Sequence, residues 1–381
     1  MDLDTLQTTL LKSGPDAAAD ALCESLRQAE DYHALFYALL MKARVKLGVS
    51  PFPTGPATDL PAEAHEPYED AIRQAAREVG NIYLGKQDIP RAWGFFRLIN
   101  EPQPVIDALN TVQPGPDDDT YPLLDIAWHQ RVSPRRGFDI LLDRNGICSA
   151  ITTLGQTDLS NDIPLRVDCI SKLVVALHEQ LRERLINDWT ERNLTVPSDT
   201  AIPKLLRDEL FVDEVYHVDV SHLASVVQMA LELPPGPALN QARELCAYGR
   251  WLAPGFRGDG DSPFENNYDD YAVYLAVIAG ENVDAGLKHF EAKIAAELPE
   301  GNTFPAEVFI NLLVRLNRDQ DALAAAKTYL AEVPLEATLS CPGIADLARK
   351  VGDYAGLADA ARAKGDAVQY LAGLIAATKA G

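Results

Sequence analysis

The sequence lacks the features that mark membrane proteins and the common enzyme classes. No apolar run reaches the roughly 18–20 residues that a membrane-spanning helix needs, and the first residues, MDLDTLQTTLLKSG, are acidic where a signal peptide is basic. It contains no phosphate-binding glycine loop, no nucleophile elbow and no kinase signature. These absences predict a cytoplasmic protein with no membrane partner, and they leave the common enzyme classes unsupported.

Basic residues are scarce compared with acidic ones. The chain has 34 Lys and Arg against 56 Asp and Glu, which gives a formal net charge of −22. Phosphate backbones and anionic membrane surfaces are bound mainly through Lys and Arg. We therefore expect no nucleic-acid partner, and we interpret the negative charge as a solubilising surface.

Cysteines are few, and their spacing forms no recognised motif. The chain has five of them, an odd number, far apart and with no CxxC pair. This pattern predicts buried reduced thiols rather than a disulfide framework or a zinc site. The motifs of the chain predict no cofactor.

Strict apolar–polar alternation is nearly absent, whereas apolar residues recur at helical spacing between Pro and Gly breaks. The chain is therefore predicted to be all-α. Its most regular helix is predicted over 164–193, where the apolar stripe consists of Ile170, Leu173, Leu177, Leu181, Leu185 and Trp189. The breaks suggest three regions, namely 1–115, a middle at 116–235 that contains this long helix, and 236–381.

A repeat pattern is visible on either side of that middle region. In residues 76–104 the pattern is carried by Val79, Gly80, Tyr83, Ala92, Phe96 and Pro104. In residues 306–334 the same relative positions are held by Leu313, Ala322 and Pro334, without the glycine. This spacing resembles the tetratricopeptide repeat, whose period is about 34 residues.

The resemblance implies antiparallel helical pairs stacked as a right-handed α-solenoid. In that family a small residue lets the two helices approach, aromatic side chains fill the space between them, and a proline ends the second helix. No repeat is visible between about 120 and 225, so the middle is expected to be an irregular helical region. An irregular helical bundle is the alternative architecture for the whole chain.

The segment DEVYHVDVSHLASVVQM places His217, Asp219 and His222 within six residues. Imidazole and carboxylate groups together suit a divalent transition metal. The spacing is not that of HExxH, in which both histidines lie on one helical face. In the other interpretation, Asp219 or Ser221 caps the following helix and the histidines pack at the edge of the core.

A second segment, WHQRVSPRRGFDILLDRNGICSAITTLG, holds the densest basic cluster of the chain. Arg135 and Arg136 could bind a carboxylate or phosphate, and His129 could act as a base for Cys148. The alternatives are ion pairs between the arginines and nearby acidic residues, and a structural role for the buried thiol.

Two functional hypotheses follow. In the first, the chain is a scaffold whose concave surface binds a protein or peptide, as tetratricopeptide-like proteins do. In the second, it is a metal-dependent or histidine-based enzyme, or a metal-binding protein, with its site in residues 128–222. Only this second hypothesis calls for a divalent transition metal.

Overall fold

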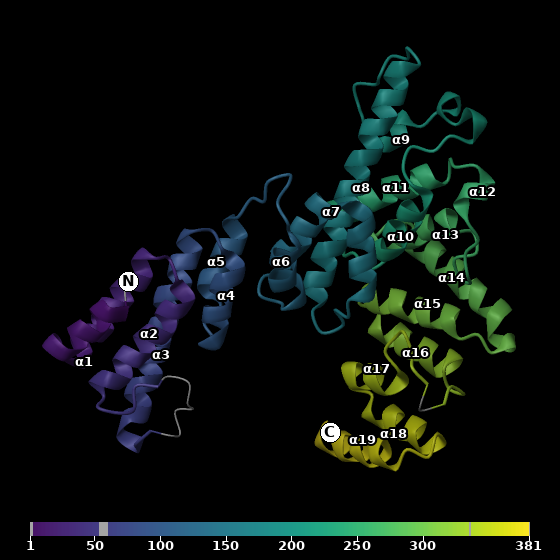
Figure 1. The fold of residues 1–381 in the computed structure, drawn as a ribbon. Coiled ribbons are helices and arrows are strands. Elements are labelled where there is room, and N and C mark those ends of the chain that lie inside the picture. The colour runs from purple at the N-terminus through teal and green to yellow at the C-terminus, as the bar shows by residue number, and fades with distance from the viewer. Residues whose placement is uncertain (1–2, 53–59, 335–336, 381) are drawn as a thin grey trace. The chain divides into compact units, whose positions relative to one another are not determined.

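The computed structural model describes residues 3–52, 60–334 and 337–380 (Figure 1). Helices make up 72% of it, and the described residues form nineteen α-helices and no strand. The prediction of an all-α protein is therefore confirmed. Contacts group the chain into two compact units, residues 1–150 and 151–381.

The first unit contains seven helices, the last of which continues past residue 150. They are α1 (Leu3–Gln28), α2 (Tyr32–Lys46), α3 (Ala62–Gly85), α4 (Ile89–Leu98), α5 (Gln103–Thr111), α6 (Tyr121–Leu124) and α7 (Pro134–Gln156). A single π-helical turn, η2 (Asp125–His129), follows α6 directly. Gly146, with a φ of 78°, interrupts α7.

The second unit contains the remaining helices. They are α8 (Ile163–Glu191), α9 (Ile202–Leu205), α10 (Val220–Ala230), α11 (Pro237–Gly249), α12 (Pro254–Arg257), α13 (Tyr268–Ile278), α14 (Val283–Glu297), α15 (Phe304–Arg315), α16 (Asp319–Tyr329), α17 (Ile344–Val351), α18 (Tyr354–Ala363) and α19 (Ala367–Ala380). Short 3₁₀ turns lie at η3 (Asp208–Leu210), η4 (Val212–Glu214) and η5 (Leu298–Glu300).

Side-chain caps start several of these helices. Asp88 accepts a hydrogen bond from the Arg91 amide, and Pro90 lies in the first turn of α4. Such a cap satisfies one of the amides that a helix start leaves without an intrahelical partner. Asp162 and Asp219 cap α8 and α10 in the same way.

Close approach of α3 and α4 organises the core of the first unit. A Cβ atom on Gly80 would lie 2.7 Å from Cε2 of Phe96, so only glycine leaves room for that ring. Phe96 and Ala92 are fully buried at this contact, and Tyr83 stacks on Phe95. Glycine at this position therefore lowers the helix propensity of α3 but permits tight packing between the two helices.

The longest helix of the second unit, α8, buries its apolar stripe on neighbouring helices. All six stripe residues, from Ile170 to Trp189, are buried. The helices that pack on α8 are α9, α10 and α11. From α13 to α19, consecutive helices pack on one another (Figure 1).

No helix in the described parts of the chain combines the length and apolar character that crossing a bilayer requires. Four cysteines, Cys23, Cys169, Cys246 and Cys341, are buried, while Cys148 is exposed. The division of the sequence into 1–115, 116–235 and 236–381 stays a prediction.

Candidate functional site: a buried polar network beside an open groove

The basic segment of the first unit is partly committed to the backbone. Arg136 donates to the carbonyl oxygens of Leu109 (3.1 Å) and Val112 (2.5 Å) at the carboxyl end of α5. A guanidinium in this position satisfies carbonyls that have no partner within the helix. Arg135 is exposed on α7. Anion binding by these two arginines stays a prediction.

His129 and Cys148 also lie in the first unit. His129 is exposed at the end of η2, and Cys148 is exposed on α7 just beyond the interruption at Gly146. The predicted pairing of this imidazole with the thiol stays a prediction.

The candidates of the 213–222 segment point to different partners. The Asp219 carboxylate is exposed and accepts from the Ser221 and His222 amides at 2.8 and 3.2 Å, so it caps α10. His222 is half-buried in the first turn of that helix, and His217 is buried just before it. Within the described ranges, no group of three or more His, Cys, Asp or Glu side chains is placed to hold a metal ion.

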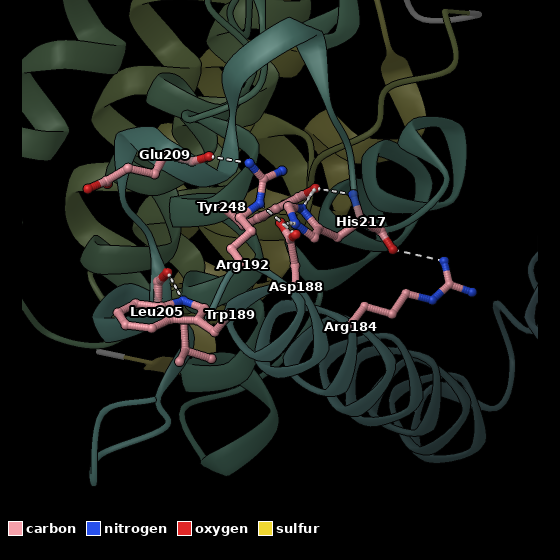
Figure 2. Close-up of polar contacts among 8 residues, drawn as sticks. All are labelled: Arg184, Asp188, Trp189, Arg192, Leu205, Glu209, His217 and Tyr248. Carbon is pink, nitrogen blue, oxygen red and sulfur yellow. Dashed lines mark hydrogen bonds and ion pairs between the residues drawn. The ribbon is translucent and has the colours of Figure 1, made fainter. Parts of the chain in front are cut away.

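His217 instead joins two distant helices through a polar network (Figure 2). Its Nε2 lies 3.1 Å from Oδ2 of Asp188 on α8, and its Nδ1 lies 3.2 Å from the hydroxyl of Tyr248 on α11. The same hydroxyl accepts from the His217 amide at 2.7 Å. Both ring nitrogens and the backbone of one histidine thus connect α8 to α11.

The tautomer of His217 sets the hydrogen-bond roles in this network. In the neutral tautomer with its proton on Nε2, the imidazole donates to Asp188 and Nδ1 accepts from the Tyr248 hydroxyl, whose oxygen accepts from the His217 amide. Burial lowers the pKa of His217, although the nearby Asp188 carboxylate opposes that effect. Burial raises the pKa of Tyr248 to about 12, which keeps its hydroxyl protonated.

Asp188 stays ionised within this network. Burial alone would raise its pKa, but hydrogen bonds from Arg192 and His217 outweigh burial and leave the pKa below its usual value. The bond from Nε of Arg192 to Oδ1 of Asp188 is 2.7 Å long. A fixed negative charge therefore lies opposite the proton on Nε2 of His217.

Three further donors from the carboxyl-terminal part of α8 hold the backbone of residues 205–217, as Figure 2 shows. The bonds are those of Arg184 to the carbonyl of His217 (2.8 Å), Trp189 to that of Leu205 (2.9 Å) and Arg192 to that of Glu209 (2.8 Å). Because this segment forms only short helical turns, its carbonyls need such side-chain partners. The network fixes the path of the segment across α8 and α11.

The segment held in this way carries aromatic side chains that face the end of α11. The Phe211 ring lies 5.7 Å from the rings of His217 and Tyr248 and 5.4 Å from that of Trp251, measured between centroids. Trp251 is 38% exposed. The buried network thus places an indole at the surface, where a ligand can contact it.

Trp251 lines one of three adjoining hollows that together form a groove along α11 and α13, which we term the α11–α13 groove. Their volumes are about 600, 550 and 540 Å³, and all three include Arg250. Ala247 and Ala272 contribute small side chains to its surface. Backbone and small side chains leave space there for a ligand chain.

Charge changes sign along the α11–α13 groove. The hollow beside Trp251 is lined by Arg250, Arg257 and a single carboxylate, Asp269. The neighbouring hollow shares Arg250 and Asp269 with it and adds Asp270 and Glu281, and Arg250 is the one Arg or Lys among its described lining residues. One hollow is therefore more basic and the other more acidic, and each favours ligand charges of the opposite sign.

Ion pairs order the side chains of the groove. Arg250 pairs with Asp269 at 2.7 Å, and both side chains are about half-exposed, at 54% and 53%. In the more acidic hollow, the buried Asp270 accepts from His289 at 2.7 Å and from Lys293 at 2.9 Å. These pairs hold the charged groups in place before any ligand arrives, which reduces the entropy cost of binding.

The two parts of the site differ in what they can do chemically. Tyr248 has no exposed surface and His217 is only 8% exposed, so neither can reach a substrate in solution. Their role is to position the 205–217 segment. The open α11–α13 groove suits binding of a ligand chain rather than bond chemistry.

Searches against protein-family models, curated proteins and solved structures find no match.

Sequence reasoning identified His217 but missed its partners and the groove. Asp188 and Tyr248 lie 29 and 31 residues from it in the chain. One usable signal was the spacing of Arg184, Asp188 and Arg192, which places three polar side chains on one face of the predicted long helix. The groove left no motif, because it arises from the packing of α11 on α13.

Proposed function

We propose that this chain is a helical-repeat scaffold, similar to tetratricopeptide-repeat proteins, that binds a peptide segment of a partner protein. The helix-by-helix packing from α13 to α19 supports a solenoid arrangement, because in repeat arrays each unit contacts its neighbours. The contact of Gly80 with Phe96 has the small residue and the aromatic side chain that the repeat pattern expects.

One observation carries the binding role, namely the adjoining hollows of the α11–α13 groove, with their small side chains and differing charge. All three hollows share Arg250, and their volumes of about 540 to 600 Å³ leave space for a short peptide segment.

The charges define the chemistry of the peptide. An acidic residue is expected beside Arg250 and Arg257, where the exposed Trp251 also offers an aromatic contact. A basic residue is expected near Glu281, whose side chain is 54% exposed in the neighbouring hollow. Action in the cytoplasm, without a nucleic-acid or membrane partner, is part of the same proposal.

Selection of a displayed library of random short peptides on the purified 381-residue chain tests this proposal. Peptides with an acidic residue at one end and a basic residue at the other should be enriched. The Arg250→Ala and Ala247→Glu variants should weaken binding of a selected peptide by at least about tenfold, as expected for loss of a charge contact or obstruction of the groove.

Arg349→Ala provides the matched control. The Arg349 side chain has the same 54% exposure as Arg250 and also pairs with an aspartate, Asp346, away from the groove. The control should leave the affinity unchanged. Equal losses in Arg250→Ala and Arg349→Ala, or enrichment without the charge pattern, would show that the groove is not the binding surface.

A further inference from the structure

His289 is the one histidine among the described lining residues of the α11–α13 groove. It lies on α14, and its side chain is 38% exposed in the hollow that Asp269 and Asp270 also line. An imidazole with this exposure can contact a chain that occupies the hollow.

One ring nitrogen of His289 is held by a buried carboxylate. Its Nε2 lies 2.7 Å from Oδ1 of Asp270, a residue that is only 1% exposed. The other oxygen, Oδ2, accepts from the Asn266 amide at 2.8 Å and from Nζ of Lys293 at 2.9 Å, and Lys293 also pairs with Glu265. Donors on both oxygens hold the carboxylate of Asp270 in one orientation, and this carboxylate in turn holds the imidazole.

This contact determines which ring atom remains for a ligand. A carboxylate accepts hydrogen bonds, so Nε2 of His289 donates to Asp270. In the neutral imidazole Nδ1 is then an acceptor. The two ring nitrogens point in widely different directions, so Nδ1 is turned away from the buried carboxylate. Within the described parts of the chain, the hydrogen bond of His289 to Asp270 uses Nε2 and leaves Nδ1 available.

A peptide that enters this hollow needs hydrogen-bond acceptors. Its backbone N–H groups lose water there, and an amide left without a partner costs free energy. The carbonyls of the surrounding helices are used within those helices. The carboxylates of Asp269 and Glu281 already pair with Arg250 and Arg243. Several lining residues have no polar side chain, namely Ala272, Val273, Ala276, Val277, Ala285 and Gly286.

We propose that Nδ1 of His289 accepts a hydrogen bond from one backbone amide of the bound peptide, while Asp270 positions the ring for that bond. This inference rests on the peptide-binding role proposed above and adds a fixed point to it, because the bond sets the register of the peptide in the groove. Proline has no amide hydrogen and is therefore excluded from that position of the peptide.

Backbone N-methylation of a selected peptide, one residue at a time, tests the proposal at about pH 8, where histidine is ordinarily neutral. One of the methyl groups should weaken binding to the wild-type chain by about three- to tenfold, as loss of a neutral hydrogen bond does. In the His289→Ala chain the same methyl group should change the dissociation constant by less than about twofold, because the bond is already absent. A merely structural role of His289 would not single out one amide.

His222→Ala is the matched control. His222 is half-buried like His289 and belongs to the same unit, but it lies outside the described lining of the groove. This variant should keep the wild-type response to every methyl group. The sensitive position should also lack proline among the enriched peptides.

The outcomes separate this inference from the proposal on which it rests. Peptides that bind more weakly to Ala247→Glu occupy the groove. If their methylation effects were the same in the wild type and in His289→Ala, or were lost equally in His222→Ala, the role of His289 would be overturned and the groove would stand. If Ala247→Glu weakened no selected peptide, the groove would not be the binding surface and both proposals would fail.

Discussion

Tyr248 shows how one buried hydroxyl can serve two bonds at once. Its oxygen accepts from the amide of His217 and lies within hydrogen-bond distance of Nδ1 of the same residue. A buried amide that loses its acceptor costs more free energy than the bond itself contributes. The hydroxyl of Tyr248 is therefore a large part of what fixes the 205–217 segment.

Tyr248→Phe should lower the free energy of unfolding by about 1–3 kcal/mol, because it leaves a buried amide without an acceptor. Tyr268→Phe is a suitable control in the same unit. The Tyr268 ring is similarly buried, but its hydroxyl has no hydrogen-bond partner among the described residues, so its removal should be neutral or slightly stabilising. Urea unfolding of the two variants measures the difference, and equal effects would argue against the assigned role.

The lowered pKa of His217 makes stability depend on pH. The unfolded chain binds a proton near pH 6.5, whereas the folded side chain does so only at lower pH. The contribution of neutral His217 to the free energy of unfolding is therefore complete above about pH 6.5. It is lost as the pH falls through the pKa of the folded state. The groups that face the imidazole are Asp188, Arg184 and Arg192 from α8 and Tyr248 from α11.

His217→Asn should accordingly flatten the decline in the free energy of unfolding as the pH falls from about 6.5 toward 5. Asp188 also has a lowered pKa, but its contribution is lost only below about pH 4, so the two effects occupy separate windows. Denaturant unfolding at a series of pH values measures both slopes. A variant that keeps the full wild-type slope would show that His217 is not the titrating group.

The role of a single residue could be predicted from the sequence only where its hydrogen-bond partner lies a few residues away. The Asp88 cap was predictable because its partner lies three residues away. The partners of His217 were not, because hydrogen bonds over 29 and 31 residues depend on how α8 meets α11. The close spacing of His217, Asp219 and His222 suggested metal ligands, whereas in the structure Asp219 caps α10 and His217 contacts Asp188 and Tyr248.

At the scale of elements, the α3–α4 pair shows a conflict between helix propensity and packing. Alanine is a better helix former than glycine by about 1 kcal/mol. At Gly80, however, a methyl group would lie 2.7 Å from the ring of Phe96, which is fully buried and has no room to move. Packing decides the residue at this position.

Gly80→Ala should therefore lower the free energy of unfolding, by about 1–2 kcal/mol after the gain in propensity is subtracted from the overpacking. Gly94 on α4 is the matched control, because a Cβ there would meet no atom within 4 Å. Gly94→Ala should raise the free energy of unfolding by about 0.5–1 kcal/mol. Thermal unfolding distinguishes the two, and stabilisation by both changes would contradict the packing explanation.

Periodicity was a sound guide to helices but not to how they pack. The apolar stripe from Ile170 to Trp189 is buried on one helix, because the apolar face of an amphipathic helix packs against the core. The α11–α13 groove left no such trace. It is lined by alanines and by arginines that also suit a solvent-facing helix.

For the whole molecule, the net charge of −22 predicts which partners are disfavoured but says nothing about architecture. The absence of a nucleic-acid or membrane partner stays a prediction. The breaks at Pro and Gly mark helix ends. Contacts group the chain at residue 150, close to the interruption of α7 at Gly146, where no proline-rich connector occurs.

The position of Trp251 also gives the molecule a built-in optical probe. Of the four tryptophans, Trp128 and Trp189 are buried and Trp93 is half-buried in the first unit, whereas Trp251 is 38% exposed and lines the basic hollow of the α11–α13 groove. A chain that settles there would remove water from the indole and shift its emission to shorter wavelength. Binding in the groove can therefore be measured by intrinsic tryptophan fluorescence, without a label.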